Sequence, residues 1–204
     1  MKNKSLIIAT FLVGLFITII IIIPKHKSKK KFNPGKGVTT NLKYTFKTEK
    51  AEHLSVMAFE SKKLKKFDEA IELYRQAIKI EPNNPRLFFD LSECYTNTNK
   101  PERAILILDT AIMLDKTCAA FYNNRGLIYW KLYRDQNAIN DYKKAIELDS
   151  TNWVFYGNIS RVYYANNKLI DACINLQIAK RLGLDLRNVT DDEEIQKIAK
   201  VCKQ

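Results

Sequence analysis

The stretch FDEAIELYRQAIKIEPNN, residues 67–84, predicts one amphipathic helix that is followed by a turn. Its apolar residues recur at helical spacing, and two alanines, Ala70 and Ala77, lie seven residues apart on one face. Pro82 and the asparagines after it are residues that end helices. A face of small side chains suits a helix whose axis approaches a second helix to about 8–10 Å.

Both alanines recur along the chain at a step of 34 residues. A fixed period of this length is the signature of a repeat architecture. The aligned positions are Ala70, Ala104, Ala138 and Ala172; Ala77, Ala111, Ala145 and Ala179; and Tyr95, Tyr129 and Tyr163. Four units therefore fill the middle of the chain, at residues 51–84, 85–118, 119–152 and 153–186.

Each unit predicts two helices with a turn between them, because its apolar residues are spaced for helices and do not alternate as in strands. Asp68, Asp135 and Asp171 carry the negative charge that suits a helix N-terminus. Pro101 suits the first turn of a helix, where no amide proton is needed. The sequence thus predicts an all-α chain of helix-turn-helix units.

This pattern resembles the tetratricopeptide repeat family, whose unit is a helix-turn-helix of about 34 residues. The family's other signature positions hold bulky Leu54, Phe88, Tyr122 and Tyr156, and small Ala58, Ser92, Gly126 and Ser160. The resemblance covers residues 51–186 and implies a right-handed superhelical solenoid of four units.

Arg125 departs from the family pattern, because it stands at a usually apolar position. We favour an arginine whose stem is packed and whose head reaches water or a carboxylate. The alternative is a charge that is directed at a ligand.

Residues 190–204 predict a helix that caps the last repeat. Thr190 and Glu193 form a capping-box pattern. The apolar stripe that would lie on the last repeat consists of Ile195, Ile198, Ala199 and Cys202. Terminal caps of this kind keep repeat arrays soluble.

Residues 6–23 predict a transmembrane helix that follows a short tail, residues 1–5. These 18 residues carry no charge, and as a helix they span about 27 Å, close to the hydrocarbon thickness of a bilayer. A cleaved signal peptide is the competing interpretation, but no pair of small residues suited to cleavage follows the run. We expect a single-pass membrane protein.

Residues 24–50 are rich in lysine, proline and glycine, and predict a flexible basic tether. The excess of lysines after the span favours a cytoplasmic repeat domain over a periplasmic or extracellular one. Lys2 and Lys4, which precede the span, leave the second orientation open. The four scattered cysteines show no pairing pattern and fit a reducing compartment.

Composition argues against several functional classes. Eleven of the 34 basic residues and one of the 22 acidic residues lie in residues 1–50, so this segment carries +10 of the formal net charge of +12. A nearly neutral repeat domain lacks the basic face that nucleic-acid binding needs. With His26 and His53 as the only histidines and no glycine-rich phosphate loop, we expect no metal, cofactor, small-molecule substrate or enzymatic activity.

The family resemblance implies a concave groove, lined by the first helix of each repeat, that binds an extended peptide or a partner protein. The residues expected in it are Arg86, Phe89, Asp90, Glu93, Asn123, Asn124, Leu127, Trp130, Lys131, Asn158, Arg161 and Tyr164. Relatives that grip the terminal carboxylate of chaperones use a Lys and Asn pair where this chain has Ser55 and Phe59, so that grip is not expected. The alternative is a constitutive subunit of a membrane-associated complex that docks through its outer helix faces.

Overall fold

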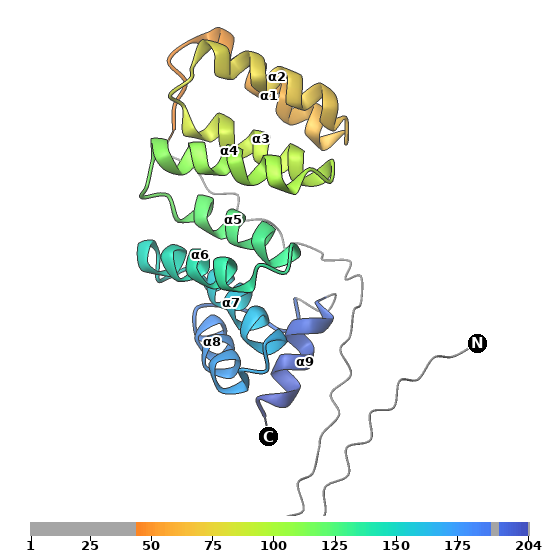
Figure 1. Ribbon diagram of the computed structural model, residues 1–204, viewed down its shortest axis with the longest axis vertical. Helices are drawn as coiled ribbons and strands as arrows, with labels where there is room; N and C mark the ends of the chain where they lie inside the picture. Colours follow the sequence, from red (N-terminus) through yellow and green to blue (C-terminus); the bar gives the residue numbers. More distant parts are fainter. Residues whose placement is uncertain (1–43, 189–191, 204) are drawn as a thin grey trace, which may run out of the picture. The chain divides into compact units, whose positions relative to one another are not determined.

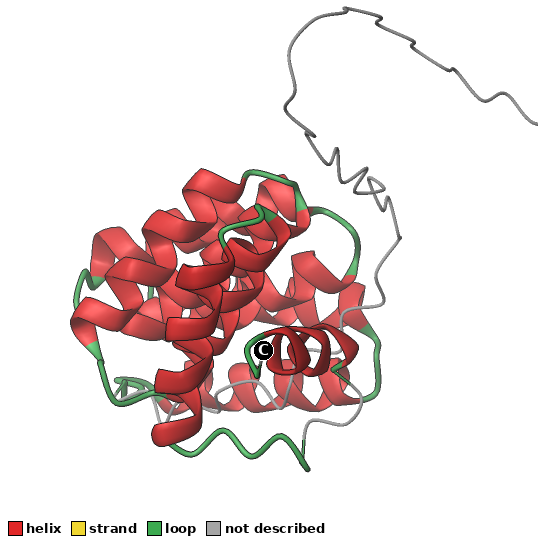
Figure 2. Cartoon of the chain, turned by 90° about the horizontal axis from the view of Figure 1, so that it is seen from below, coloured by secondary structure: helices red, strands yellow, loops and turns green. Residues whose placement is uncertain are grey.

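The computed structural model describes residues 44–188 and 192–203, and in these ranges the chain forms helices and connecting turns without a strand (Figure 2). The helices are α1 (Glu49–Lys63), α2 (Phe67–Ile80), α3 (Pro85–Asn97), α4 (Pro101–Leu114), α5 (Ala119–Lys131), α6 (Asp135–Leu148), α7 (Trp153–Ala165), α8 (Leu169–Arg181) and α9 (Glu193–Val201). None of these described helices is long and apolar enough to cross a membrane. The predicted tail and span, residues 1–23, and most of the predicted tether lie outside the described residues.

The first eight helices form four antiparallel pairs that stack one after another (Figure 1). Each pair consists of a first helix and a second helix, and each second helix also packs on the first helix of the next pair. The helix α9 lies against α7 and α8. This arrangement confirms the predicted all-α solenoid of helix-turn-helix repeats.

The periodic alanines lie at the contacts between helices. All eight have no exposed surface. At Gly126, another predicted small position, an added Cβ would lie 3.1 Å from the ring of Tyr142 and 3.2 Å from Cβ of Asp141, because α5 and α6 approach closely there. The spacing of small residues in the sequence thus corresponds to the spacing of close helix contacts.

The turn inside each repeat contains a residue with positive φ. These residues are Lys65, Asn99, Tyr133 and Asn167, with φ between 58° and 60°. In each turn the next amide donates to the carbonyl five residues before it, as Arg134 N does to Tyr129 O at 2.9 Å, which closes the first helix as a Schellman motif does. Asparagine tolerates this left-handed conformation, whereas a bulky side chain is strained in it.

Arg125 joins three consecutive helices through its guanidinium. Its Nε and Nη2 donate to the two carboxylate oxygens of Asp141 on α6, at 2.8 and 2.7 Å. Its Nη1 donates to Asp109 on α4 at 2.6 Å. The interpretation of Arg125 as a packed arginine that reaches a carboxylate is therefore confirmed.

Two predictions at the C-terminus are wrong. The N-cap of α9 is Asp192, whose carboxylate accepts from Ile195 N at 3.1 Å, so Glu193 is the first helical residue and not the third, which a capping box requires. Thr190 lies outside the described residues. The second wrong prediction is that the scattered cysteines are unpaired, because Cys173 and Cys202 form a disulfide. The apolar face of α9 lies on α8, which brings the two Cα atoms to 5.4 Å, a separation that a disulfide spans without rearrangement.

We expect Tyr133→Gly to stabilise the chain by roughly 1 kcal/mol, because glycine relieves the left-handed strain. Tyr133 is 81% exposed, so its removal gives up little buried surface. Urea unfolding of both chains measures the change. Asn99→Gly is the matched control and should be close to neutral, because asparagine already tolerates this φ. An unchanged or lower midpoint for Tyr133→Gly contradicts the proposed strain.

We expect Arg125→Ala to cost about 3 kcal/mol, because it leaves the buried carboxylate of Asp141 without its bidentate partner. The double variant Arg125→Met/Asp141→Leu removes both charges and keeps the packed volume, so it should be more stable than Arg125→Ala. The urea unfolding midpoints of the original chain and of the two variants measure these differences in stability. Equal stability of Arg125→Ala and the original chain would show that the ion pair contributes nothing.

Candidate functional site

The predicted groove residues all lie on α3, α5 and α7, which are first helices of their repeats. The first helices approach one another, since α1 contacts α3 and α5 contacts α7. Along this surface the structure separates the predicted residues into two groups. One group, on α3, lies beside the segment that leads into α1, and the other, on α5 and α7, lies near the start of α9.

The segment that leads into α1, residues 44–48, is called the entry segment here. The ring of Tyr44 stacks on the ring of Phe121, with a centroid separation of 6.1 Å and an interplanar angle of 16°. Its hydroxyl donates a hydrogen bond to Asp115. Phe121 also packs against Phe89, at 5.5 Å between ring centroids. The predicted groove residue Phe89 is thus buried in an aromatic cluster that the entry segment completes.

Glu81 holds the other end of the entry segment. Its Oε1 accepts from the backbone amides of Lys47 and Thr48, each at 2.7 Å, and from the hydroxyl of Thr48 at 3.0 Å. Its Oε2 accepts from Asn84 at 3.2 Å. Burial raises the pKa of Glu81, but the hydrogen bonds to the charged form outweigh it and lower that pKa below its usual value. Sequence reasoning missed this anchor; the one available signal was a carboxylate at the C-terminal end of a helix, where the helix dipole disfavours it.

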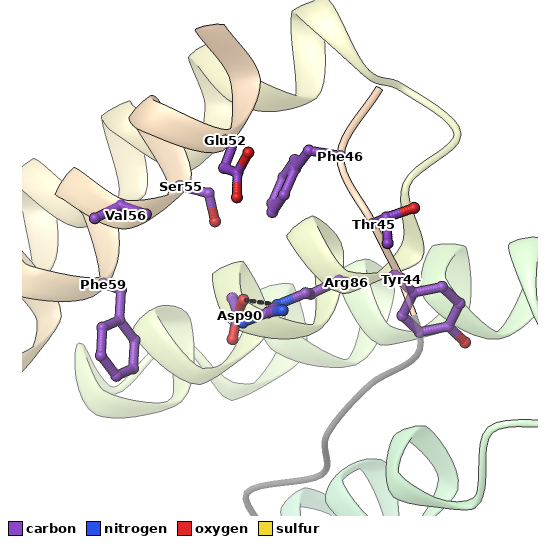
Figure 3. A pocket seen from close by; sticks show the side chains of 9 residues that line it. All are labelled: Tyr44, Thr45, Phe46, Glu52, Ser55, Val56, Phe59, Arg86 and Asp90. Atoms are coloured by element: carbon purple, nitrogen blue, oxygen red, sulfur yellow. Dashed lines mark ion pairs between the residues drawn. The ribbon is translucent and has the colours of Figure 1, made fainter. Parts of the chain in front are cut away.

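Helices α1 and α3 and the entry segment enclose a hollow of about 430 Å³ (Figure 3). Two predicted groove residues, Arg86 and Asp90, line it together with Ser55 and Phe59. The other lining residues are Tyr44, Thr45, Phe46, Glu52 and Val56. Val56 and Phe59 remain 54% and 45% exposed, so the hollow presents apolar surface to solvent.

Charged side chains of α1 and α3 pair with one another beside this hollow, and two of them, Arg86 and Asp90, line it. Asp90 lies 3.6 Å from Nε of Arg86 and 3.7 Å from Nζ of Lys62. Lys62 donates to the predicted groove residue Glu93 at 2.7 Å. Burial raises the pKa of Asp90 to about 6, against the opposing attraction of Lys62 and Arg86.

The predicted amides on α5 and α7 form a single polar row. Asn158 donates to Asn123 at 2.9 Å, and Asn123 donates to Asn124 at 3.3 Å. Arg161 donates to Asn158 at 2.6 Å and pairs with the carboxylate of Asp192, the N-cap of α9. Asn123, Asn158 and Arg161 are buried, whereas Asn124 is partly exposed. Arg161, which was predicted to face a ligand in the groove, therefore already pairs with a carboxylate of the same chain.

The remaining predicted groove residues differ in their exposure. Leu127, Trp130 and Tyr164 are partly buried, and the last two pack against the hydrophobic core of the C-terminal repeats. Lys131 is exposed. Within residues 44–188 and 192–203, no group of three or more His, Cys, Asp or Glu side chains is placed to hold a metal ion.

Several curated proteins are similar to part of this chain. Hsc70-interacting protein 1 of Drosophila melanogaster is 35% identical over 78 residues, which is 38% of this chain and 21% of that protein. Hsp70-Hsp90 organizing protein 2 of Arabidopsis thaliana is 27% identical over 81 residues, 40% of this chain and 14% of that protein. The chain therefore matches only about a fifth or less of the length of these relatives.

Solved structures show the same fold. The first TPR domain of Spaghetti (RPAP3) bound to the HSP90 peptide SRMEEVD is 25% identical, with a TM-score of 0.56, over 58% of this chain and 94% of that one. MamA from Desulfovibrio magneticus RS-1 is 14% identical, with a TM-score of 0.63, over 75% of this chain and 91% of that one. Residues 63–125 and 119–152 each match a family model described as tetratricopeptide repeat. The described part of the chain is thus an all-α solenoid of tetratricopeptide repeats.

Proposed function

We propose that this chain is a non-enzymatic interaction module that binds an extended segment of a partner protein along the first helices of its repeats. The observation that carries this proposal is the hollow between α1, α3 and the entry segment. It offers exposed apolar side chains, Val56 and Phe59, beside the charged Arg86 and Asp90. Apolar surface with a few polar groups at its floor is the usual composition of a site that binds a ligand.

The similar proteins support a peptide as the ligand. The RPAP3 domain is bound to a peptide of HSP90, and the curated relatives are named for Hsc70, Hsp70 and Hsp90. In this chain the two positions at which the family grips a chaperone's terminal carboxylate are Ser55 and Phe59, and both line the hollow. Neither carries a positive charge or an amide, so we propose a partner segment that is recognised in another way.

The alternative, a constitutive subunit that docks through its outer helix faces, predicts one broad apolar surface on the second helices. Exposed apolar residues do occur there, at Leu106 and Met113 on α4 and at Ile170 and Ile174 on α8. However, α6 lies between α4 and α8 in the stack, and its exposed side chains include the charged Lys143. The division into two small groups favours the groove as the principal binding surface.

We further propose that residues 6–23 anchor the chain in a membrane and that residues 24–43 link the repeats to it. The last part of the predicted tether, residues 44–50, instead packs on the repeats as the entry segment and the start of α1. The uncharged run of 18 residues supports the anchor.

The side of the membrane on which the repeats lie is indicated by the disulfide between Cys173 and Cys202, which supports an oxidising compartment, where such bonds persist. This argument favours the periplasmic or extracellular side over the cytoplasmic side that the lysine count indicated.

Replacing the exposed apolar residues of the hollow, in Val56→Ser/Phe59→Ser, should reduce recovery of specific partners at least tenfold, the loss expected when about 1.4 kcal/mol of binding energy is removed. The measurement is affinity recovery of the full-length chain from cells, followed by quantitative mass spectrometry. The control is Leu106→Ser/Met113→Ser on α4, which removes similarly exposed apolar surface.

The control variant should keep its partners, and both variants should melt close to the original chain because the replaced side chains are exposed. Loss of partners only in the α4 variant would instead support docking through the outer helices. Loss in neither variant would contradict both interpretations.

The number of free cysteine thiols can be measured in the cells that produce the chain, and it reports whether the disulfide forms there. Polyethylene-glycol maleimide, applied after acid quenching and denaturation, should label two cysteines without a reductant and all four after reduction, because Cys173 and Cys202 are bonded. Cys202→Ser should give three labels in both conditions. Four labels on the original chain without reduction would place the repeats in a reducing compartment and contradict the proposed side.

A further inference from the structure

The hollow contains a partly buried carboxylate whose contacts with the neighbouring cations are long. The side chain of Asp90, on α3, is 14% exposed, and it is held by ion pairs with Arg86 and Lys62. Its contacts with Arg86 and Lys62, at 3.6 and 3.7 Å, are longer than the about 2.7–2.9 Å of a charge-assisted hydrogen bond. A carboxylate in this position gains from an added donor.

The two neighbouring cations are shared between Asp90 and other surroundings. Lys62 already donates to Glu93 at 2.7 Å. Arg86 has a side chain that is 42% exposed, so much of its charge is in contact with water. The raised pKa of Asp90 agrees with this geometry, because it reflects burial that these cations do not fully offset.

The rest of the hollow suits a long side chain with a positive head. Figure 3 shows Glu52 on α1 and Asp90 on α3 on opposite sides of the hollow, with Phe46 and Phe59 toward its two ends. Glu52 is exposed and takes part in no ion pair within the described ranges. With two carboxylates and the single guanidinium of Arg86, the lining carries a net negative charge.

We propose that the hollow binds the lysine or arginine side chain of a partner segment. The aliphatic stem packs against Phe46 and Phe59, and the head donates to Asp90 and Glu52. Aromatic rings and carboxylates together are the surroundings that such amphipathic cations prefer. This inference rests on the proposed peptide-binding function and adds the chemistry of the ligand, because an acidic side chain in the same place meets like charge.

The test uses the full-length chain, labelled with 15N in a neutral maltoside detergent. The probes are four peptides, acetyl-Ala-Ala-X-Ala-Ala-amide, in which X is arginine, lysine, norleucine or glutamate. The arginine and lysine peptides should shift the amide signals of Phe59 and Asp90 saturably, and the norleucine peptide, which has the stem without the charge, should bind at least tenfold more weakly. The glutamate peptide should cause no shift there.

Two variants locate the head of the bound side chain. Glu52→Gln and Asp90→Asn should each weaken binding of the arginine peptide about fivefold or more. Glu60→Gln is the matched control, since Glu60 is an exposed carboxylate on the same helix that pairs with Lys63 and lines no part of the hollow. Because Glu52 is exposed, its variant tests the proposal in a folded chain even if Asp90→Asn lowers the melting temperature.

Equal binding of the arginine and norleucine peptides, preference for glutamate, or no saturable shift at the hollow with either basic peptide would overturn the inference. These results leave the proposed function intact if Val56→Ser/Phe59→Ser still loses its cellular partners. If that variant keeps its partners, the proposed function fails whatever the pentapeptides show.

Discussion

The close contact between helices at the buried alanines is the constraint on which the rest of this structure depends. Each of these alanines has no exposed surface, and the 34-residue period reproduces the same close packing along the chain. A single pair of helices cannot bury its apolar faces alone, and stacking on the neighbouring pair completes the burial. The same stacking aligns the first helices beside one another and so creates the surface on which the candidate site lies.

The two ends of that surface are closed by parts of the chain outside the regular repeats. At the start, Glu81 fixes the backbone of the entry segment, and Tyr44 completes the cluster of Phe89 and Phe121. At the other end, α9 is held by its disulfide to α8 and by the pair of Asp192 with Arg161. The hollow between α1, α3 and the entry segment lies at the first of these ends. Exposed apolar side chains and the carboxylate of Asp90 line it together.

The period predicted the helices, their pairing and the buried small residues, because those features repeat and each repeat confirms the others. The family resemblance placed the predicted groove residues on first helices. The period could not predict that Asn158 and Arg161 bond to Asn123 and Asp192, that Cys173 bonds to Cys202, or that Glu81 anchors the entry segment. Each of these contacts occurs once and joins residues far apart in the sequence, so no periodic signal marks it.

We propose that the hollow, and not the outer face of the second helices, contacts the partner. Photo-crosslinking in living cells tests this proposal, with p-benzoylphenylalanine in place of Phe59 in one chain and in place of Met113 on α4 in another. We expect a discrete crosslinked protein from position 59 and none from position 113. A discrete product from position 113 alone would show that the partner does not contact the hollow and would support docking through the outer helices.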